Sequence, residues 1–325
     1  MESNIMNNFR QMMNKLGSNR EPFLFIIDFE MKMPLIYTLD KLPENILFDI
    51  PLSRNITRQK GSSAEMSILK NPVTYERYLL SFENVMKNIR HGNSYLLNLT
   101  FPTEIVTSSS LDDIFFTSQA RYRILMRNKF VVFSPETFIM IDDDTINTFP
   151  MKGTIDASVP DAERIIIGDE KEIAEHNTIV DLLRNDLSIV SNNVTVKRFR
   201  YIDKIITTDR TLLQVSSRIA GKLDKNWNEN IGTIMISLLP AGSVSGAPKK
   251  ETVRIIRESE TGARGYYTGV FGVFDGVSLD SAVMIRYIEQ NGSEYVYRSG
   301  GGITSLSDPE KEYDELISKV YVPVG

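Results

Sequence analysis

Apolar residues recur along the chain in patterns that predict both helices and strands. A compact apolar run at 22–29 indicates a buried strand, and residues 2–16 indicate a short amphipathic helix that stops at Gly17. A longer amphipathic helix is expected to begin after Thr74 and to stop at Gly92. Its apolar residues share one stripe: Tyr75, Leu79, Phe82, Met86 and Ile89.

The rest of the chain alternates between clusters of strands and separate helices. We expect strands over 94–105, 129–142 (broken at Ser134-Pro135-Glu136), 194–201, 211–223, 269–276, 281–289 and 294–303. Helices are expected over 168–187, 248–262 and 307–320, the last two beginning with proline. Residues 50–72 read as polar and irregular. This order favours an α+β fold over strict βαβ alternation, and we expect one large domain.

Composition excludes several chemistries. The chain has no cysteine and only two histidines, which excludes disulfides, thiolate chemistry and a multi-histidine zinc site. A net charge of −5 gives no support for binding nucleic acid. The first residues lack the pattern of a secretory signal, and no apolar run is long enough to cross a bilayer. We therefore expect a soluble, cytoplasmic protein.

A run of small residues at 240–252, PAGSVSGAPKKET, is a candidate anion site. Small side chains let backbone N–H groups approach a ligand, and Pro248 starts a helix whose N-terminal dipole favours negative charge. The run is neither a P-loop, since Ala247 follows Gly246, nor a nucleophile elbow, since Val244 occupies the serine position. The alternative is a tight turn that only caps the helix.

Two further features suit a carboxylate ligand. Three glycines in RSGGGITS (298–305) expose backbone donors after a strand, although a flexible turn would look the same. Arg286 falls inside the expected apolar strand 281–289, where a buried guanidinium needs an anionic partner. A structural salt bridge is the alternative for Arg286.

Two acidic helices are candidates for a Mg²⁺ site. Glu172 and Glu175 share one helix face, and Glu312 and Glu315 share another with Lys319. Mg²⁺ prefers a few carboxylate oxygens together with water and substrate oxygens. Taken singly, each helix could equally present a solvated charged face.

Lys152 and Glu136 are candidates for covalent and acid chemistry. Lys152 lies in FPMKGTID, a predicted strand-to-turn segment, where partial burial would lower its pKa and free the amine as a nucleophile. Glu136 could be kept protonated by an apolar setting and so act as an acid. Each signal is weak alone, because most lysines and glutamates are surface residues.

Taken together and in order, these segments resemble the chorismate-utilising enzymes, a family that includes anthranilate, aminodeoxychorismate, isochorismate and salicylate synthases. The resemblance covers roughly residues 74 to 320 and is carried by nine blocks: GNSYLLNLT, FSPETF, MKGT, KEIAEH with IVDLLRNDL, PAGSVSGAPK, RGYYTGVFG, the arginine strand, SGGGI and DPEKEYDELISK. It implies two orthogonal antiparallel β-sheets sandwiched by helices. It also implies a shortened N-terminal region (1–73) that contributes to the sheet, and a chorismate-binding catalytic region (74–325).

The resemblance also assigns roles to residues. It implies Mg²⁺ at Glu175 and Glu315, with Glu172 and Glu312 completing the acidic cluster, and Glu136 as the general acid for the C4 hydroxyl. Positions that match carboxylate binding are Ser243, Gly246, Tyr267, Arg286, Gly300, Gly301, Gly302 and Lys319.

The branch of the family is indicated by Lys152. The sequence is similar here to aminodeoxychorismate synthase component I, whereas anthranilate and isochorismate synthases carry alanine at this position. That similarity implies that Lys152 is the nucleophile and that ammonia comes from a separate glutamine amidotransferase subunit, since this chain lacks cysteine.

Two positions depart from the family. Leu96 stands where relatives have lysine or glutamine, which argues against water activation, and Leu213 stands where relatives have histidine. No tryptophan-binding L-E-S signature is found, so we do not expect feedback inhibition by tryptophan. Anthranilate synthase component I and a non-catalytic chorismate-binding subunit are the alternatives.

Overall fold

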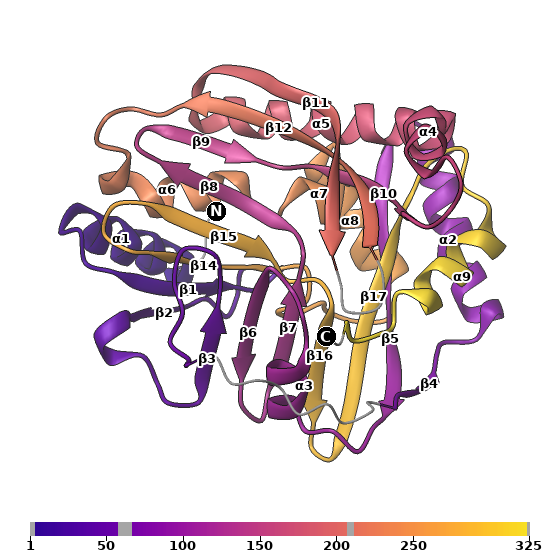
Figure 1. Ribbon diagram of the computed structural model, residues 1–325, viewed down its shortest axis with the longest axis horizontal. Helices are drawn as coiled ribbons and strands as arrows, with labels where there is room; N and C mark the ends of the chain where they lie inside the picture. Colours follow the sequence, from indigo (N-terminus) through magenta and orange to yellow (C-terminus); the bar gives the residue numbers. More distant parts are fainter. Residues whose placement is uncertain (1–3, 58–66, 207–210, 324–325) are drawn as a thin grey trace.

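The chain folds around two antiparallel β-sheets whose strands cross at a steep angle (Figure 1). A computed structural model describes residues 4–57, 67–206 and 211–323. The α+β class and the pair of antiparallel sheets predicted from the sequence are confirmed.

The larger sheet has the strand order β10-β12-β9-β8-β15-β14-β1-β2, with β11 paired to β12. Its strands are β1 (Phe23–Ile27), β2 (Leu35–Thr38), β8 (Thr137–Asp142), β9 (Thr145–Thr148), β10 (Met151–Asp156), β11 (Asn192–Ile206), β12 (Thr211–Lys222), β14 (Val270–Phe274) and β15 (Leu279–Val283).

The second sheet has the order β13-β5-β17-β16-β7-β6-β3, with β4 paired to β5. Its strands are β3 (Ile46–Asp49), β4 (Leu69–Asn71), β5 (Leu96–Val106), β6 (Tyr122–Met126), β7 (Phe130–Ser134), β13 (Gly246–Ala247), β16 (Tyr287–Asn291) and β17 (Glu294–Ile303).

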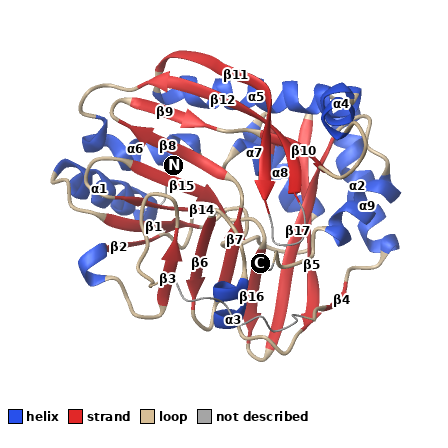
Figure 2. Cartoon of the chain, in the orientation of Figure 1, coloured by secondary structure: helices blue, strands red, loops and turns tan. Residues whose placement is uncertain are grey.

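Helices cover the outer faces of both sheets (Figure 2). They are α1 (Asn4–Ser18), α2 (Tyr75–Arg90), α3 (Leu111–Thr117), α4 (Ala162–Gly168), α5 (Glu170–Val190), α6 (Ile231–Leu238), α7 (Gly242–Ser245), α8 (Lys249–Ser259) and α9 (Pro309–Ser318), with 3₁₀ turns at Leu39–Lys41 and Trp227–Asn230. Helices α1 and α6 pack on the larger sheet, and α2, α8 and α9 pack near β5. Within the described residues, no helix is long and apolar enough to cross a membrane.

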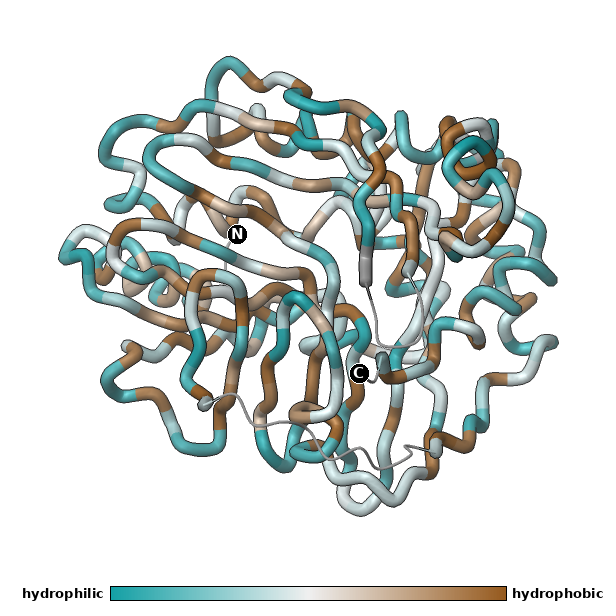
Figure 3. The backbone as a smooth tube through the Cα atoms, viewed as in Figure 1, coloured by the Kyte–Doolittle hydropathy of each residue, from teal (hydrophilic) through white to brown (hydrophobic). Residues whose placement is uncertain are grey.

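Strand β1, which lies between β14 and the edge strand β2, explains the unbroken apolar run at 22–29 in the sequence. Phe23, Phe25 and Ile27 face α1 and α6, whereas Leu24 and Ile26 face the second sheet. Because a strand alternates its side chains, a strand that is buried on both faces must be apolar throughout. One apolar core layer therefore lies between the larger sheet and helices α1 and α6, and a second lies between the two sheets. The outer connections are mostly hydrophilic (Figure 3).

Many element predictions are confirmed. The side chain of Thr74 caps α2 by accepting a hydrogen bond from the backbone of Arg77, and α9 begins at Pro309. The predicted break at Ser134-Pro135-Glu136 separates β7 from β8, which belong to different sheets. Helices α3, α4 and α6 were not predicted from the pattern.

Two predictions about strands were wrong. The run 281–289 is not one strand, because β15 ends at Val283 in the larger sheet and β16 begins at Tyr287 in the second. Arg286 lies in the crossover between them, with a φ of 53°. The strand predicted over 294–303 is confirmed as β17, but the three glycines 300–302 lie within it and pair with β5, so the interpretation that they follow a strand is wrong.

The chain therefore crosses between the sheets at two neighbouring corners, β7 to β8 and β15 to β16. The corners are hydrogen-bonded to each other: Phe133 N donates to Arg286 O at 3.0 Å, and Val283 N donates to Glu136 O at 3.1 Å. These two backbone hydrogen bonds thus fix the positions of Glu136 and Arg286 relative to each other.

Candidate active site

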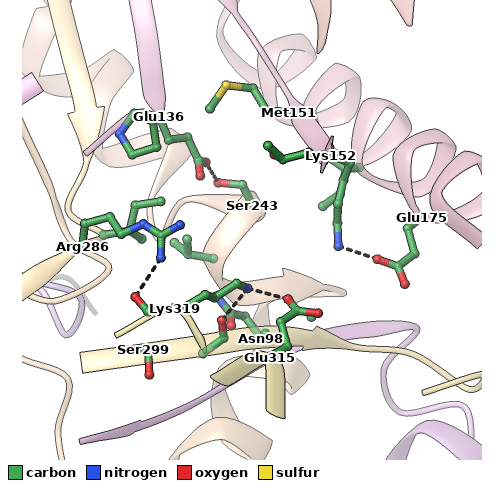
Figure 4. Close-up of a pocket in the computed structure, with 18 of the residues that line it drawn as sticks. Asn98, Glu136, Met151, Lys152, Glu175, Ser243, Arg286, Ser299, Glu315 and Lys319 are labelled. Atoms are coloured by element: carbon green, nitrogen blue, oxygen red, sulfur yellow. Dashed lines mark hydrogen bonds and ion pairs between the residues drawn. The ribbon is translucent and has the colours of Figure 1, made fainter. Parts of the chain in front are cut away.

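A cavity of about 540 Å³ lies beside these corners, walled by β5, β10, β17, α5, α7 and α9. All fourteen residues proposed from the sequence as site residues line it: Glu136, Lys152, Glu172, Glu175, Ser243, Gly246, Tyr267, Arg286, Gly300, Gly301, Gly302, Glu312, Glu315 and Lys319. Figure 4 draws 18 of the residues that line this cavity, labels ten of them, and marks contacts between them.

Lys152 projects from β10 toward α5, where its ammonium group contacts the carboxylate of Glu175 (Figure 4). Burial lowers the pKa of Lys152, but Glu175, Glu172 and Glu315 outweigh that effect and leave the pKa above its usual range. The expectation that the pKa of Lys152 is lowered was therefore wrong for the protein without ligand. The position itself agrees with the prediction, because the side chain is only 26% exposed and lies beside an acidic helix.

Gly302 borders the space around Lys152. A Cβ built on Gly302 would lie 3.2 Å from Leu96 Cδ1 and 4.0 Å from Lys152 Nζ. Any side chain here would enter the space in front of the lysine, so glycine keeps the approach to the amine open.

Glu136 faces the cavity from the β7–β8 corner and accepts a hydrogen bond from the hydroxyl of Ser243 on α7 (Figure 4). Burial raises the pKa of Glu136, while the hydrogen bond from Ser243 and the charges of Lys319 and Lys152 partly oppose the rise. A carboxyl group with a raised pKa can stay protonated near neutral pH and act as an acid.

The four predicted glutamates approach the cavity from two helices. Glu175 and Glu312 are buried, which contradicts the alternative of a solvated face for these two, and Glu315 is exposed at the rim. A Cβ built on Gly301 would lie 3.4 Å from Glu312 Oε2 and 3.6 Å from Glu315 Oε1, so both carboxylates converge on this glycine.

This donor set suits a hard divalent cation. Carboxylate oxygens are the side-chain ligands that Mg²⁺ prefers, and Glu175 and Glu315 each already hold a lysine ammonium group. In the described part of the chain no three acidic or histidine side chains are grouped as ready-made ligands. The residues therefore fit a metal by their chemistry, with substrate and water oxygens needed to complete its shell.

Arg286 and Lys319 form the cationic wall of the cavity. Arg286 Nη1 donates to the backbone oxygen of Lys319 at 2.9 Å, and its guanidinium lies 4.6 Å from the ring centroid of Tyr321. Lys319 Nζ lies 2.6 Å from Glu315 Oε1 and donates to Gly300 O at 2.9 Å. Since Arg286 uses one nitrogen on a carbonyl and has no ion pair with a carboxylate among the described residues, the structural salt-bridge alternative is not supported.

The glycine run presents backbone groups to the cavity along one edge of β17. Pairing with β16 ends at Arg298, whereas pairing with β5 continues to Ile303. Backbone groups of Ser299–Gly302 on the β16 side are therefore available to a ligand or to Lys319, which already binds Gly300 O. This geometry suits a carboxylate.

Gly246 and Tyr267 have structural constraints of their own. Gly246 has a φ of 126°, and a Cβ there would lie 1.9 Å from Leu96 O, so only glycine fits. Tyr267 is buried, and burial raises its pKa. Both line the cavity, Gly246 at the β13–β5 pairing and Tyr267 on the wall.

Several polar residues of the cavity wall were not predicted from the sequence, and Asn98 and Gln214 are two of them. Asn98 on β5 has a buried side-chain oxygen without a hydrogen-bond partner among the described residues. Gln214 on β12 also lines the cavity, and its amide lies 3.4 Å from Thr154 Oγ1. Asn98 could have been found from its position two residues after Leu96, because alternate strand residues share a face.

The two departures from the family pattern have different locations. Leu96 lines the cavity and packs with Ile179, Val180 and Leu183 of α5. Leu213 is buried, whereas the next residue, Gln214, faces the cavity.

The fold is shared with solved structures of other proteins. The structure superposes on a protein from Bacillus anthracis described as a 2,3-dihydroxybenzoate-specific isochorismate synthase, with a TM-score of 0.75 and 18% identity over 98% of this chain and 88% of the other. At that identity the likeness establishes the fold alone.

Sequence comparison establishes the family. Residues 39–324 match the family model described as chorismate binding enzyme. An uncharacterized PabA-like protein of Pasteurella multocida is 50% identical over 98% of this chain and 98% of its own length. An anthranilate synthase component 1 of Haloarcula marismortui is 32% identical over 76% of this chain and 52% of its own length. The chain belongs to the chorismate binding enzyme family, which confirms the resemblance inferred from the motifs.

Proposed function

We propose that the protein is component I of aminodeoxychorismate synthase, which converts chorismate and ammonia to 4-amino-4-deoxychorismate in para-aminobenzoate and folate biosynthesis. The observation that carries this proposal is Lys152. Its amine enters the cavity beside Glu175 and faces the open space at Gly302. An isochorismate or anthranilate synthase has no need of an amine nucleophile from the protein at this position.

The first displacement begins with the loss of a proton from the Lys152 ammonium, and the carboxylate that contacts it, Glu175, is the nearest acceptor. Nζ then forms a bond to ring carbon C2, the two ring double bonds shift, and the C4–O bond breaks. Glu136 gives its proton to the departing oxygen, which leaves as water.

The second displacement restores the lysine. Ammonia attacks C4, the double bonds shift back, and the C2–N bond to Lys152 breaks, so nitrogen is left para to the ring carboxylate. The nitrogen that came from ammonia loses a proton. In sum, chorismate and ammonia give aminodeoxychorismate and water.

The other residues orient the dianionic substrate. We assign the carboxylates of chorismate to Arg286, Lys319, Ser243 and the backbone of 300–302, with Gly246 and Tyr267 shaping the wall. Glu172, Glu175, Glu312 and Glu315 would hold Mg²⁺, which when bound would screen a substrate carboxylate from these glutamates and polarise it. Fixed positioning and electrostatics lower the barrier to both displacements.

Ammonia is proposed to come from a glutamine amidotransferase subunit. Such glutaminases use a cysteine nucleophile, and this chain has no cysteine. Leu96 and its apolar neighbours on α5 make a poor site for a base that activates water, which supports ammonia over water as the second nucleophile.

The test is to identify the product. Purified protein is incubated with chorismate, Mg²⁺ and ammonium, and the product is separated by chromatography. Aminodeoxychorismate is expected. Isochorismate, anthranilate or unreacted chorismate under conditions in which a known synthase is active would disprove the proposal.

The second candidate is anthranilate synthase component I, which is the printed name of the Haloarcula marismortui relative. It differs in leaving nitrogen ortho to the ring carboxylate, without a covalent lysine adduct. Anthranilate is fluorescent, so the same reaction mixture distinguishes the two.

A further inference from the structure

A partly buried ion pair links α5 to α8, next to the short helix α7 that carries Ser243. Lys249, the first residue of α8, places Nζ 2.9 Å from Asp186 Oδ1 and donates to Leu238 O at 2.7 Å. Asp186 is only 7% exposed. The mechanism proposed above uses neither residue.

Asp186 lies on the same helix as the acidic pair Glu172 and Glu175. It follows Glu175 by three turns of α5, about 16 Å along the axis. Helix α5 therefore reaches from the proposed metal side of the cavity to the ion pair with α8.

The carboxylate of Asp186 also packs closely against the first residue of α7. A Cβ built on Gly242 would lie 2.8 Å from Asp186 Oδ2 and 3.2 Å from Leu182, so the first residue of α7 fits only without a side chain. The next residue is Ser243, whose hydroxyl donates to Glu136. One short turn thus connects Asp186 to the proposed acid.

We propose that the Asp186–Lys249 ion pair is a positioning device that holds the α7–α8 turn against α5, so that Ser243 stays on Glu136. Asp186 and Lys249 touch no reacting atom and act through Ser243. The inference rests on the proposed function only in giving Glu136 the role of acid, because the contacts themselves stand without it.

The charges of Asp186 and Lys249 favour a fixed position of the α7–α8 turn against α5. Burial raises the pKa of Asp186 while the charge and hydrogen bond of Lys249 oppose the rise, so Lys249 favours the charged carboxylate. Loss of Lys249 would leave the buried carboxylate of Asp186 without its charged partner at the base of α7, and loss of Asp186 would remove the contact that joins Lys249 to α5. The turn would then be free to shift, and the hydrogen bond from Ser243 to Glu136 would weaken.

The state of Glu136 reports on that hydrogen bond independently of turnover. The charged groups that act on Glu136 are Lys319 and Lys152, and the hydrogen bond from Ser243 lowers its pKa against the effect of burial. The Glu136 carboxyl is titrated by carbon NMR in protein labelled with ¹³C-glutamate, with E136Q to assign the signal. We expect D186N to raise the pKa of Glu136 in the same direction as S243A, and the double variant to add no further shift.

Kinetics give a second measurement. In K249M we expect kcat to fall at least tenfold with little change in KM for chorismate, and the alkaline limb of the kcat profile to move to higher pH. K249R, which keeps the charge, should retain most of the activity. D144N removes a solvent-accessible ion pair with Lys222 and serves as the matched control, for which no change is expected.

The possible outcomes separate the two proposals. If S243A moves the titration of Glu136 and both D186N and K249M leave it unchanged, the positioning role is disproved. If S243A has no effect, the premise that Ser243 controls Glu136 is wrong and the inference falls with it. If the pKa of Glu136 shifts as expected in the variants but the protein makes no aminodeoxychorismate, the proposed function is disproved and the positioning role stands. Circular dichroism checks that each variant folds, and K249M replaces D186N should the latter not fold.

Discussion

Lys152 and Glu175 are in direct contact across the cavity, so the proposed nucleophile is held as an ammonium ion by a residue that would also bind metal. Twenty-three residues separate them in the sequence, one on β10 and the other on α5. The contact couples the protonation of the amine to whatever occupies the acidic side of the cavity.

Replacing Lys152 with alanine removes the amine without disturbing the backbone of β10. We expect K152A to lose aminodeoxychorismate formation by at least about 10³-fold, because the covalent route is closed, while chorismate still binds through the cationic wall. Product formation is measured by chromatography and binding by calorimetry. K222A, at an exposed lysine of β12, is the control. Undiminished turnover in K152A would rule out the nucleophile.

Neutralising a glutamate on either helix should weaken metal binding. E175Q and E315Q each remove one negative charge from the set that converges on the cavity, so we expect a higher Mg²⁺ concentration for half-maximal activity, by roughly tenfold or more. Calorimetric titration with Mg²⁺ and chorismate compares the Mg²⁺ affinity of the variants with that of the unmodified protein, independently of activity. E310Q, at an exposed position in the first turn of α9, is the control. Wild-type titrations in both variants would refute the ligand roles.

Asn98 offers a test in which stability and activity should move in opposite directions. Its side-chain oxygen is buried and has no hydrogen-bond partner in the part of the chain that the structure describes, which destabilises the free protein and suits a hydrogen-bond donor of the ligand. N98L, which is close in shape, should raise the free energy of unfolding by about 1 kcal/mol and lower kcat/KM by about tenfold. Chemical denaturation and initial rates measure the two effects. A variant that loses stability and keeps activity would contradict this role.

Asp280 should give a pH dependence of stability unrelated to the cavity. Burial raises its pKa to about 6 from 3.8, against hydrogen bonding from Tyr122. Between pH 4 and 6 the folded state binds more protons than the unfolded state, so this residue's contribution is fully present below pH 4 and is lost as pH rises through 6. The change amounts to about 3 kcal/mol.

D280N removes this titration and should flatten the stability profile over the same window, as followed by urea denaturation at several pH values. D142N, at an exposed carboxyl of the same sheet, is the control. If D280N shows the same slope as the unmodified protein, another group is responsible.

The sequence predicted most elements because their boundaries carry local signals. Pro309 and Thr74 mark helix starts, and β17 follows its alternation from Glu294 to Ile303. The position of Arg286 could not be predicted in this way. Both β15 and β16 contribute buried apolar residues, so the run 281–289 shows no change of pattern where the chain leaves one sheet for the other.

The candidate residues could be collected from the sequence, but their electrostatics could not. The burial of Lys152, which lowers its pKa, has a local signal in the sequence. The carboxylate of Glu175, which helps to raise that pKa above its usual value, comes from a helix that is distant in the sequence. The same is true of the Ser243 hydroxyl on Glu136, 107 residues apart. Pairwise geometry of this kind depends on the packing of elements and leaves no mark on local periodicity.

The two hydrogen-bonded corners that carry Glu136 and Arg286 have a consequence for how this framework tolerates change. The spacing between acid and guanidinium is fixed by main-chain bonds at the place where the sheets meet, and surface loops do not determine it. Insertions or deletions in the outer hairpins should therefore leave that spacing intact, whereas repacking of the layer between the sheets would displace both groups as a unit.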